Sequence, residues 1–340
     1  MPIAVVAIGG NSLVKAGERG TLQEQRANLS VTCEGIAAVM AAGYHVVVTH
    51  GNGPQVGDAL LRSEMAAPQV LPLTLDACVA ETQATIGYLL QQILHETLQR
   101  RGLRRPVVTM VTQVLVSRRD PAWRNPTKPV GPFYPKEEAD RRHVAQGWTM
   151  VEDSGRGYRR VVPSPEPKEI MELAAIQGAL ANDALVIACG GGGIPVVFKR
   201  DRLVGVDAVI DKDRASSLLA WELEAELLLI STGVEQVALN YGTPREKAVA
   251  TMTPLEARRY LLEGQFAAGS MGPKIEAALA YLERGGRLAI ITSPEHISEA
   301  LQRMAGTRIE GTESGELGLG KEQRGVRSDS KPACRTTYCK

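Results

Sequence analysis

The sequence predicts an α/β protein with a doubly wound, mainly parallel sheet, and two patterns support this prediction. Short apolar runs rich in Val, Ile and Ala lack strict alternation, which is typical of strands covered on both faces. Stretches of helical character separate these runs, as in successive βα units. With 340 residues, 44% of them hydrophobic, the chain is long enough to bury a large core without disulfides.

The expected elements alternate along the chain. Strands are expected at residues 3–8, 44–49, 184–189, 225–232 and 286–293. Helices are expected at residues 25–43, 81–102 and 167–182. A further strand within 158–167 would lead back from an inserted segment to the main body.

The first three strands run into glycine-rich loops, which read GGNSL, HGNGPQVG and GGGGIP. In a doubly wound sheet, ligands bind outside the carboxyl ends of the strands, so the three loops should gather at one edge. Each loop could then offer backbone N–H groups to an anion at a helix N-terminus. The alternative for any single loop is a tight turn made of glycine.

Composition excludes several classes of function. With a net charge of +1, the chain lacks the excess of positive charge typical of proteins that bind nucleic acid or anionic membranes. Its 4% of aromatic residues argues against a base-stacking surface. No apolar run reaches 18 residues, and the first residues read as a core strand and not as a signal peptide. The five cysteines form no CxxC pair, which favours buried free thiols and a cytoplasmic location.

Two segments depart from the βα pattern. Residues 118–165 are rich in proline and charge, and we expect a small lid or lobe inserted into a domain of residues 1–310. Residues 311–340 are polar and glycine-rich, and we expect a disordered tail.

Familiar cofactor motifs are not matched. No segment fits GxxxxGK[ST], and HGNGPQVG places its third glycine, Gly57, one residue late for GxGxxG. A dinucleotide-dependent oxidoreductase is therefore disfavoured. The sequence also offers no Ser-His-Asp set and no metal-type His/Cys cluster. Beside Gly51, His50 is expected to have a packing role.

Three lysines stand in unusual surroundings. Prolines closely flank Lys128, Asp211 and Asp213 flank Lys212, and Lys274 ends the bare stretch GSMGPK. The alternative for Lys128 is a solvated surface lysine, and the alternative for Lys212 is a local ion pair. For Lys274 it is an ordinary helix start with a lysine in the first turn. A cation at a helix N-terminus is unfavourable, however, and a bound anion would relieve the conflict at Lys274. Chemistry built from N–H donors and cations, with little covalent work, fits phosphoryl transfer.

Seven longer segments together resemble carbamate kinases, within the amino acid kinase superfamily. They occur in that family's order over about residues 3–310. They read AIGGNSL, THGNGPQVG, DPAWRNPTKPVGPFY, GRGYRRVVPSPEP, CGGGGIPVV, GVDAVIDKD and GSMGPKIEAA.

The resemblance implies a three-layer αβα sandwich with a mainly parallel central sheet and a small protruding subdomain. It implies a homodimer whose nucleotide-binding half covers about residues 205–310. The reaction would be phosphoryl transfer between ATP and carbamate, giving ADP and carbamoyl phosphate, with Mg²⁺ carried by the nucleotide. In cells the resemblance implies a reaction run toward ATP in arginine or related nitrogen catabolism.

The resemblance also implies roles for individual residues. Catalytic roles fall to Lys128, Lys212 and Asp213, the two lysines meeting the transferred phosphoryl group. Substrate-binding roles fall to Gly9, Gly10, Asn11, Gly51, Asn52 and Gly53. Nucleotide-binding roles fall to Asp211, Thr232, Gly233, Val234, Met271 and Lys274. No residue is expected to bind a metal directly.

One departure from the wider superfamily is informative. Acetylglutamate-type kinases have a lysine where this chain has Ala7, so the charge must come from Lys128 and Lys212. Carbamate is already anionic at neutral pH and needs no general base, which suits loops without a carboxylate. Two alternatives stay open: a kinase of another small carboxylate, and a catalytically weak sensor of nucleotide or carbamoyl phosphate. The three intact lysines argue against the sensor.

Overall fold

A computed structural model describes residues 1–15, 17–152, 157–267 and 269–310 of the chain. The tail predicted at 311–340 lies outside the described residues.

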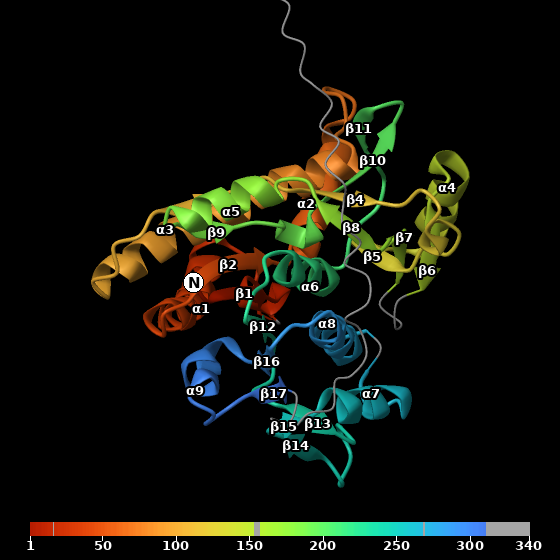
Figure 1. The fold of residues 1–340 in the computed structure, drawn as a ribbon. Helices are drawn as coiled ribbons and strands as arrows, with labels where there is room; N and C mark the ends of the chain where they lie inside the picture. Colours follow the sequence, from red (N-terminus) through yellow and green to blue (C-terminus); the bar gives the residue numbers. More distant parts are fainter. Residues whose placement is uncertain (16, 153–156, 268, 311–340) are drawn as a thin grey trace, which may run out of the picture.

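An eight-stranded sheet forms the centre of the molecule, in the order β15-β17-β16-β12-β1-β2-β9-β3 (Figure 1). Its strands are β1 (Ile3–Ile8), β2 (His45–His50), β3 (Val107–Thr109), β9 (Leu185–Ile187), β12 (Leu227–Ser231), β15 (Thr251–Met252), β16 (Leu288–Thr292) and β17 (Thr307–Glu310). Neighbouring strands run parallel except β16 and β17, which are antiparallel. The mainly parallel sheet expected from the sequence is confirmed.

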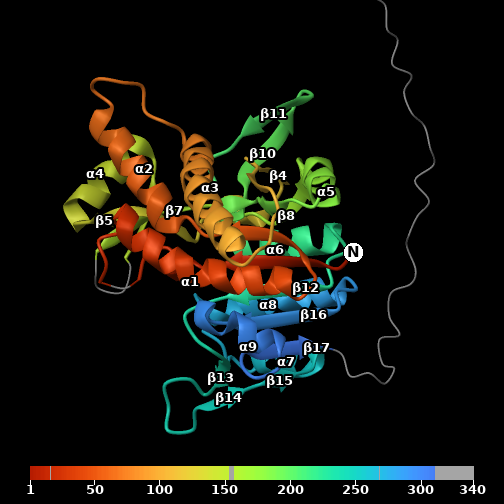
Figure 2. The ribbon, with the colours of Figure 1, turned by 90° about the vertical axis from the view of Figure 1, so that its left-hand side faces the viewer.

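Helices cover both faces of this sheet. One layer holds α1 (Leu22–Ala41), α3 (Leu75–Arg100) and α9 (Ile297–Leu301), which Figure 2 shows in front of the strands. The other holds α5 (Leu173–Ala181), α6 (Lys212–Glu222), α7 (Pro254–Leu262) and α8 (Met271–Glu283). Along β1, Ala4 and Val6 pack into the first layer while Val5 and Ala7 pack into the second. Burial on both faces explains why this strand is apolar throughout.

One expected helix is partly wrong. Residues 167–170 of the expected helix 167–182 form a strand, β8 (Pro167–Ile170), and α5 begins only at Leu173. β8 pairs antiparallel with β4 (Gln113–Val116), and Ile170 is buried in the core. The Glu172 carboxylate accepts hydrogen bonds from the backbone and side-chain N–H groups of Gln113. Long-range pairing has therefore overridden the local helical pattern.

Smaller sheets surround the central one. β4 and β8 join the hairpin β10 (Ile194–Lys199) and β11 (Arg202–Gly205), which the sequence analysis did not anticipate. β13 (Val237–Leu239) pairs with β14 (Lys247–Val249). The 3-10 turns are η1 (Gly10–Ser12), η2 (Pro121–Trp123), η3 (Gly190–Gly192) and η4 (Pro294–His296).

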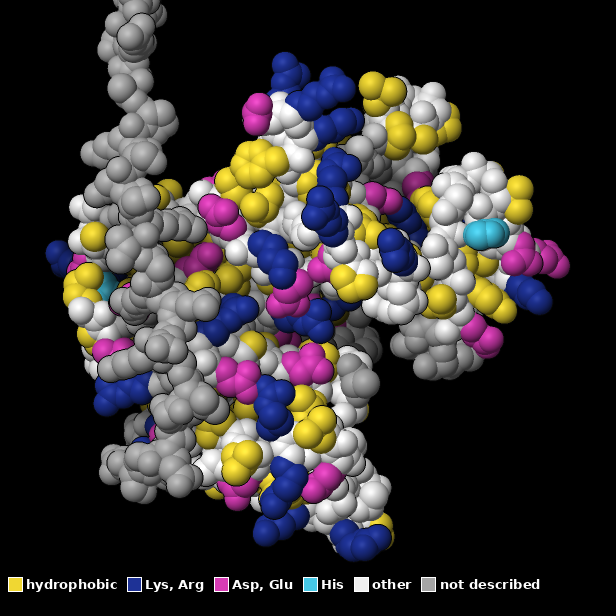
Figure 3. All heavy atoms as spheres, turned by 45° about the vertical axis from the view of Figure 1, so that its right-hand side comes forward, with side chains coloured by type: hydrophobic (Ala, Val, Ile, Leu, Met, Phe, Trp, Pro, Cys, Tyr) yellow, Lys and Arg dark blue, Asp and Glu magenta, His cyan; other side chains and the backbone are white. Residues whose placement is uncertain are grey.

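The inserted segment forms a protruding lobe. It contains β5 (Lys128–Tyr134), α4 (Lys136–Gln146), β6 (Thr149–Glu152) and β7 (Tyr158–Val162), with the strands in the order β5-β7-β6. Figure 3 shows this lobe standing out from the body.

The lobe rests on α2 (Gly53–Ala66). In α2, Glu64 accepts a hydrogen bond of 2.7 Å from Arg142, whose guanidinium also lies 4.5 Å from the Tyr134 ring centre. A Cβ added to Gly57 would lie 3.2 Å from the Cα of Gly131 in β5. These contacts place β5, and with it Lys128, over the carboxyl edge of the central sheet.

Among the described residues, no helix is both long enough and apolar enough to cross a membrane.

Candidate active site

The loops after β1 and β2 meet at the carboxyl edge of the sheet. The N–H of Gly51 donates to the carbonyl of Ile8 at 3.1 Å, and a Cβ on Gly51 would lie 3.2 Å from the Gly10 nitrogen. Gly9 is equally confined, because its Cβ would lie 3.1 Å from the Ser231 carbonyl oxygen. Glycine is what allows these backbones to approach, and the expected gathering of loops at one edge is confirmed.

The other predicted substrate residues of these loops are also placed. Asn11 belongs to η1, and Asn52 is the N-cap of α2, which begins at Gly53. The Asn52 side chain is buried and donates to Thr82 of α3. Gly53 is exposed at the start of α2, and a helix N-terminus favours an anion.

The third glycine loop, residues 190–193, behaves differently. It is buried and leads into strand β10, not into a helix. The Gly192 and Gly193 N–H groups donate within the turn, to Cys189 and Gly190 at 3.0 and 3.1 Å. The helix N-terminus expected after this loop is therefore replaced by a strand, and two of the loop's four N–H groups are used within the turn, which favours the tight-turn alternative.

Three lysines from three separate elements converge on two aspartates. Lys128 of β5 lies 2.9 Å from an Asp211 carboxylate oxygen. Lys212, the first residue of α6, lies 2.6 Å from Asp213, and Lys274 of α8 lies 3.0 Å from the other oxygen of Asp213. The structure thus brings together five residues that the sequence analysis had singled out.

Asp211 performs two tasks at once. One oxygen caps α6, accepting from the N–H groups of Asp213 and Arg214 at 2.9 and 3.3 Å. The other oxygen accepts from Lys128 of the lobe. A single N-cap therefore fixes the start of α6 and docks the lysine of the lobe there.

A second contact holds α6 against the sheet. The Ser216 hydroxyl donates to the Lys212 carbonyl at 2.7 Å and lies 2.6 Å from the Thr49 hydroxyl of β2. This contact ties the turn that carries Lys212 to the strand that leads into the Gly51 loop. The sequence analysis did not identify this pair, because two hydroxyl residues in separate elements give no recognisable pattern.

The stretch GSMGPK forms the N-terminus of α8. Ser270 is the N-cap, and Met271, the first helical residue, is half-buried. Lys274 lies at the positive end of this helix, where a cation is disfavoured. The carboxylate of Asp213 partly relieves this conflict from within the protein.

Burial and charge act against each other in this cluster. Burial raises the pKa of Asp213, but Lys212 and Lys274 outweigh it and hold that pKa well below its usual range. Burial also raises the pKa of Asp211, and Lys128 more than reverses this effect. Burial lowers the pKa of Lys212, which Asp213 opposes. Three ammonium groups against two carboxylates leave a formal excess of one positive charge, suited to an anion.

The predicted nucleotide residues Thr232, Gly233 and Val234 follow β12 at the same edge of the sheet. Thr232 donates its N–H to the carbonyl of Thr292 at 2.8 Å. Because β12 is the direct neighbour of β1, this loop lies beside the Gly9 turn. The segments predicted to bind nucleotide and substrate are therefore adjacent.

The described residues contain no group of three or more His, Cys, Asp or Glu side chains that could hold a metal ion. Both aspartates of the cluster are also committed to lysines.

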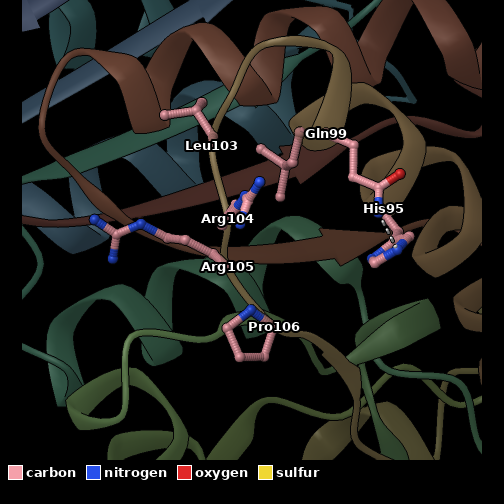
Figure 4. A pocket seen from close by; sticks show the side chains of 7 residues that line it. His95, Gln99, Leu103, Arg104, Arg105 and Pro106 are labelled. Carbon is pink, nitrogen blue, oxygen red and sulfur yellow. Dashed lines mark hydrogen bonds between the residues drawn. The ribbon is translucent and has the colours of Figure 1, made fainter.

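A cavity of about 580 Å³ lies away from the site (Figure 4). It is lined by His95, Leu98, Gln99, Leu103, Arg104, Arg105 and Pro106. These residues end α3 and precede β3, so the cavity lies at the amino edge of the parallel strands. It is therefore separate from the lysine cluster.

Comparison with known proteins agrees with this geometry. The model of the amino acid kinase family matches residues 2–293. The chain belongs to the amino acid kinase family. Within it, the chain groups with the carbamate kinases and is thus an enzyme of the phosphotransferase class.

Individual relatives match this kinase over nearly their whole length. Carbamate kinase of Thermococcus kodakarensis is 46% identical over 313 residues, which cover 91% of this chain and 99% of that protein. Carbamate kinase 2 of Enterococcus faecalis is 47% identical over 311 residues, with the same coverage. The structure of carbamate kinase from Giardia lamblia bound to AMP-PNP has 41% identity and a TM-score of 0.87, covering 92% of this chain and 99% of that one. The α/β fold class is thereby confirmed.

Removing the shared carboxylate should destabilise this kinase. The substitution Asp213→Asn keeps the side-chain size but leaves Lys212 and Lys274, whose side chains are 12% and 15% exposed, without their shared carboxylate. We expect the free energy of unfolding at pH 7 to fall by about 3 kcal/mol or more, measured by denaturant titration. As a control, Glu276→Gln removes only the exposed 3.5 Å contact with Arg214. This variant should change the free energy of unfolding by less than about 0.5 kcal/mol. A loss below about 1 kcal/mol for Asp213→Asn would contradict the proposed balance of charges.

The buried imidazole of His50 should make stability depend on pH. Burial, only partly opposed by a hydrogen bond to the Gly51 carbonyl, lowers the pKa of His50 to about 4. Below about pH 6.5 the imidazole of His50 is protonated in the unfolded chain but stays neutral in the folded protein. The free energy of unfolding therefore falls as pH is lowered toward 4. His50→Asn retains an N–H donor without titrating.

The difference in free energy of unfolding between the wild-type protein and the His50→Asn variant should therefore become smaller as pH is lowered from 7 to 4. At about 1.36 kcal/mol per pKa unit, the narrowing is about 3 kcal/mol. Denaturant titrations across this range measure it. A difference that stays constant with pH would show that the pKa of His50 is the same in the folded and the unfolded chain.

Proposed function

We propose that this protein is a carbamate kinase, which reversibly transfers a phosphoryl group between ATP and carbamate to give ADP and carbamoyl phosphate. The observation that carries the proposal is the convergence of Lys128, Lys212 and Lys274 beside the loops at Gly10 and Gly51. The names of its relatives support it.

The residues account for the chemistry of transfer. Lys128 and Lys212 lie where they can stabilise charge on the transferred phosphoryl group, and Lys274 can neutralise the nucleotide phosphates. The Lys128 side chain is 37% exposed, so its ion pair with Asp211 can exchange for a phosphate oxygen at small cost. Residues 9–12 and 51–53 contain no carboxylate to act as a base. Carbamate needs none, since its oxygen is already ionised.

Mg²⁺ is proposed to arrive with the nucleotide. This fits a site whose own carboxylates are occupied by lysines. When bound, the ion would neutralise phosphate charge, while the lysines of this chain orient the group that moves.

The direction in the cell is proposed to be toward ATP, in arginine or related nitrogen catabolism in the cytoplasm. Carbamoyl phosphate is a mixed anhydride and is a strong phosphoryl donor to ADP. An assay that starts from carbamoyl phosphate and ADP therefore tests the activity directly.

A homodimer is proposed through the outer edge of β3. Within the described chain, β3 pairs only with β9 and leaves its other edge open. Beside it lies a cavity of about 450 Å³ bordered by Tyr88 and Val111, which are 63% and 48% exposed. Exposed apolar side chains beside an open strand edge favour covering by a second copy.

The three lysines should differ in their kinetic roles. Lys128→Met and Lys212→Met should lower kcat for ATP formation by about 10²-fold or more, because their charge acts on the transition state. Lys274→Met should mainly raise KM for ADP, since its partner is bound nucleotide in ground and transition states alike. Steady-state kinetics, with circular dichroism to confirm folding, measure these effects.

The outcomes separate the alternatives. A wild-type protein that binds nucleotide but forms no ATP would be a sensor, and activity with another acyl phosphate alone would indicate a different carboxylate. Folded Lys128→Met and Lys212→Met variants with near wild-type kcat would show that the catalytic site lies elsewhere.

The dimer should dissociate when its proposed interface is charged. Tyr88→Glu should convert a dimer into a monomer in sedimentation velocity at micromolar concentration, because a carboxylate would be buried at the contact. The matched control Tyr241→Glu changes a tyrosine that is 70% exposed on the loop between β13 and β14 and should leave the dimer intact. A monomeric wild type, or a dimeric Tyr88→Glu, contradicts the proposed interface.

A further inference from the structure

Two consecutive polar residues of α3, Thr82 and Gln83, are buried behind the glycine loops. They are 3% and 1% exposed, on a helix face whose neighbours include Val79 and Ile86. Polar side chains at core positions are costly unless their hydrogen bonds are satisfied. Their partners show what they hold in place.

Thr82 holds the loop after β2. Its hydroxyl donates to the Val79 carbonyl at 2.8 Å, which uses its only proton within the helix. The same oxygen accepts from the Asn52 side-chain amide at 2.8 Å. Because Asn52 lies between Gly51 and Gly53, this bond fixes the loop proposed to receive the acceptor.

Gln83 holds the turn at residues 190–193. Its amide nitrogen donates to the carbonyls of Gly190 and Thr112 at 2.9 and 3.1 Å. Its carbonyl oxygen accepts from the Thr112 N–H at 2.8 Å. One side chain therefore joins α3 to the segment after β3 and to the buried turn.

The two contacts support one another. A Cβ on Gly191 would lie only 2.1 Å from the Asn52 amide nitrogen, so the turn packs directly against Asn52. A Cβ on Gly190 would lie 2.4 Å from His50. Asn52 is thus held between the Thr82 hydroxyl and the turn that Gln83 fixes.

We propose that Thr82 and Gln83 are positioning residues for the acceptor side of the site. They hold Asn52, and through it the backbone of residues 51–53, in the geometry that receives carbamate or the carbamoyl end of carbamoyl phosphate. Their effect falls on this loop, whereas the nucleotide segments at Thr232 and Lys274 belong to other elements. This inference rests on the proposed carbamate kinase activity.

The kinetic test uses substitutions of nearly equal size. Thr82→Val removes the hydroxyl and should lower kcat/KM for carbamoyl phosphate by about 10–10²-fold, as expected for a small misplacement of a reacting group. KM for ADP should stay within about twofold. Thr82→Ser restores the hydroxyl and should recover activity to within about threefold. Gln83→Met should resemble Thr82→Val.

The matched control is Thr85→Val, which makes the same change at an exposed position of the same helix. It should leave both KM values unchanged. Equal effects of Thr82→Val on the KM values for both substrates, or failure of Thr82→Ser to restore activity, would overturn the proposal.

A second measurement does not depend on activity. Hydrogen exchange of peptides covering 50–56 and 188–194 in the ligand-free protein should be faster in Thr82→Val and Gln83→Met than in wild type, and unchanged in Thr85→Val. Unchanged exchange in both buried variants overturns the positioning role. If exchange is faster in the two buried variants but the wild-type protein forms no ATP, the positioning role of Thr82 and Gln83 stands and only the proposed function is refuted.

Discussion

The buried carboxylate of Asp213 is the interaction on which the site depends. It accepts hydrogen bonds from Lys212 and Lys274, which stand at the N-terminal ends of α6 and α8. Two ammonium groups and two positive helix ends would otherwise repel one another across a partly desolvated space. Asp213 allows these four positive features to be assembled before any ligand arrives, which is the condition for electrostatic preorganisation.

Asp211 extends the same principle to the lobe. Because one of its oxygens caps α6 and the other receives Lys128, the lysine of the lobe docks on the end of the helix that begins with Lys212. The contacts around Asp213 are largely buried and costly to break, whereas the more exposed Lys128 pair can be exchanged at smaller cost. The cluster therefore combines a fixed part in the body with an adjustable part in the lobe, joined through one N-cap.

The sequence predicted those features that depend on local composition. Strand β1 was clear because both of its faces are buried, and the lysines stood out because proline, aspartate or glycine surrounds each of them. Their meeting could not be derived from local pattern, since Lys128 lies 83 residues from Asp211 and Lys274 lies 61 residues from Asp213. The resemblance of the seven segments to carbamate kinases was what placed the three lysines in one site.

The misses in the sequence analysis share a physical cause. Strand β8 and the turn at 190–193 are decided by partners far along the chain. Thr82 and Gln83 are polar residues at core spacing within a helix, which was the available signal, but their partners could not be named without the fold.

Neutral and charged groups come from different elements of the proposed site, and this arrangement bears on which phosphoryl acceptor it would suit. The loops at residues 9–12 and 51–53 offer backbone groups and neutral side chains, backed by the hydrogen-bonded layer of α3. The three lysines of the cluster supply ammonium groups from β5, α6 and α8. An alcohol would reach such a loop without a base to ionise it. In the proposed reaction a carboxylate-like acceptor brings its own negative oxygen, so loops without a carboxylate beside a preassembled cationic cluster would need no further base.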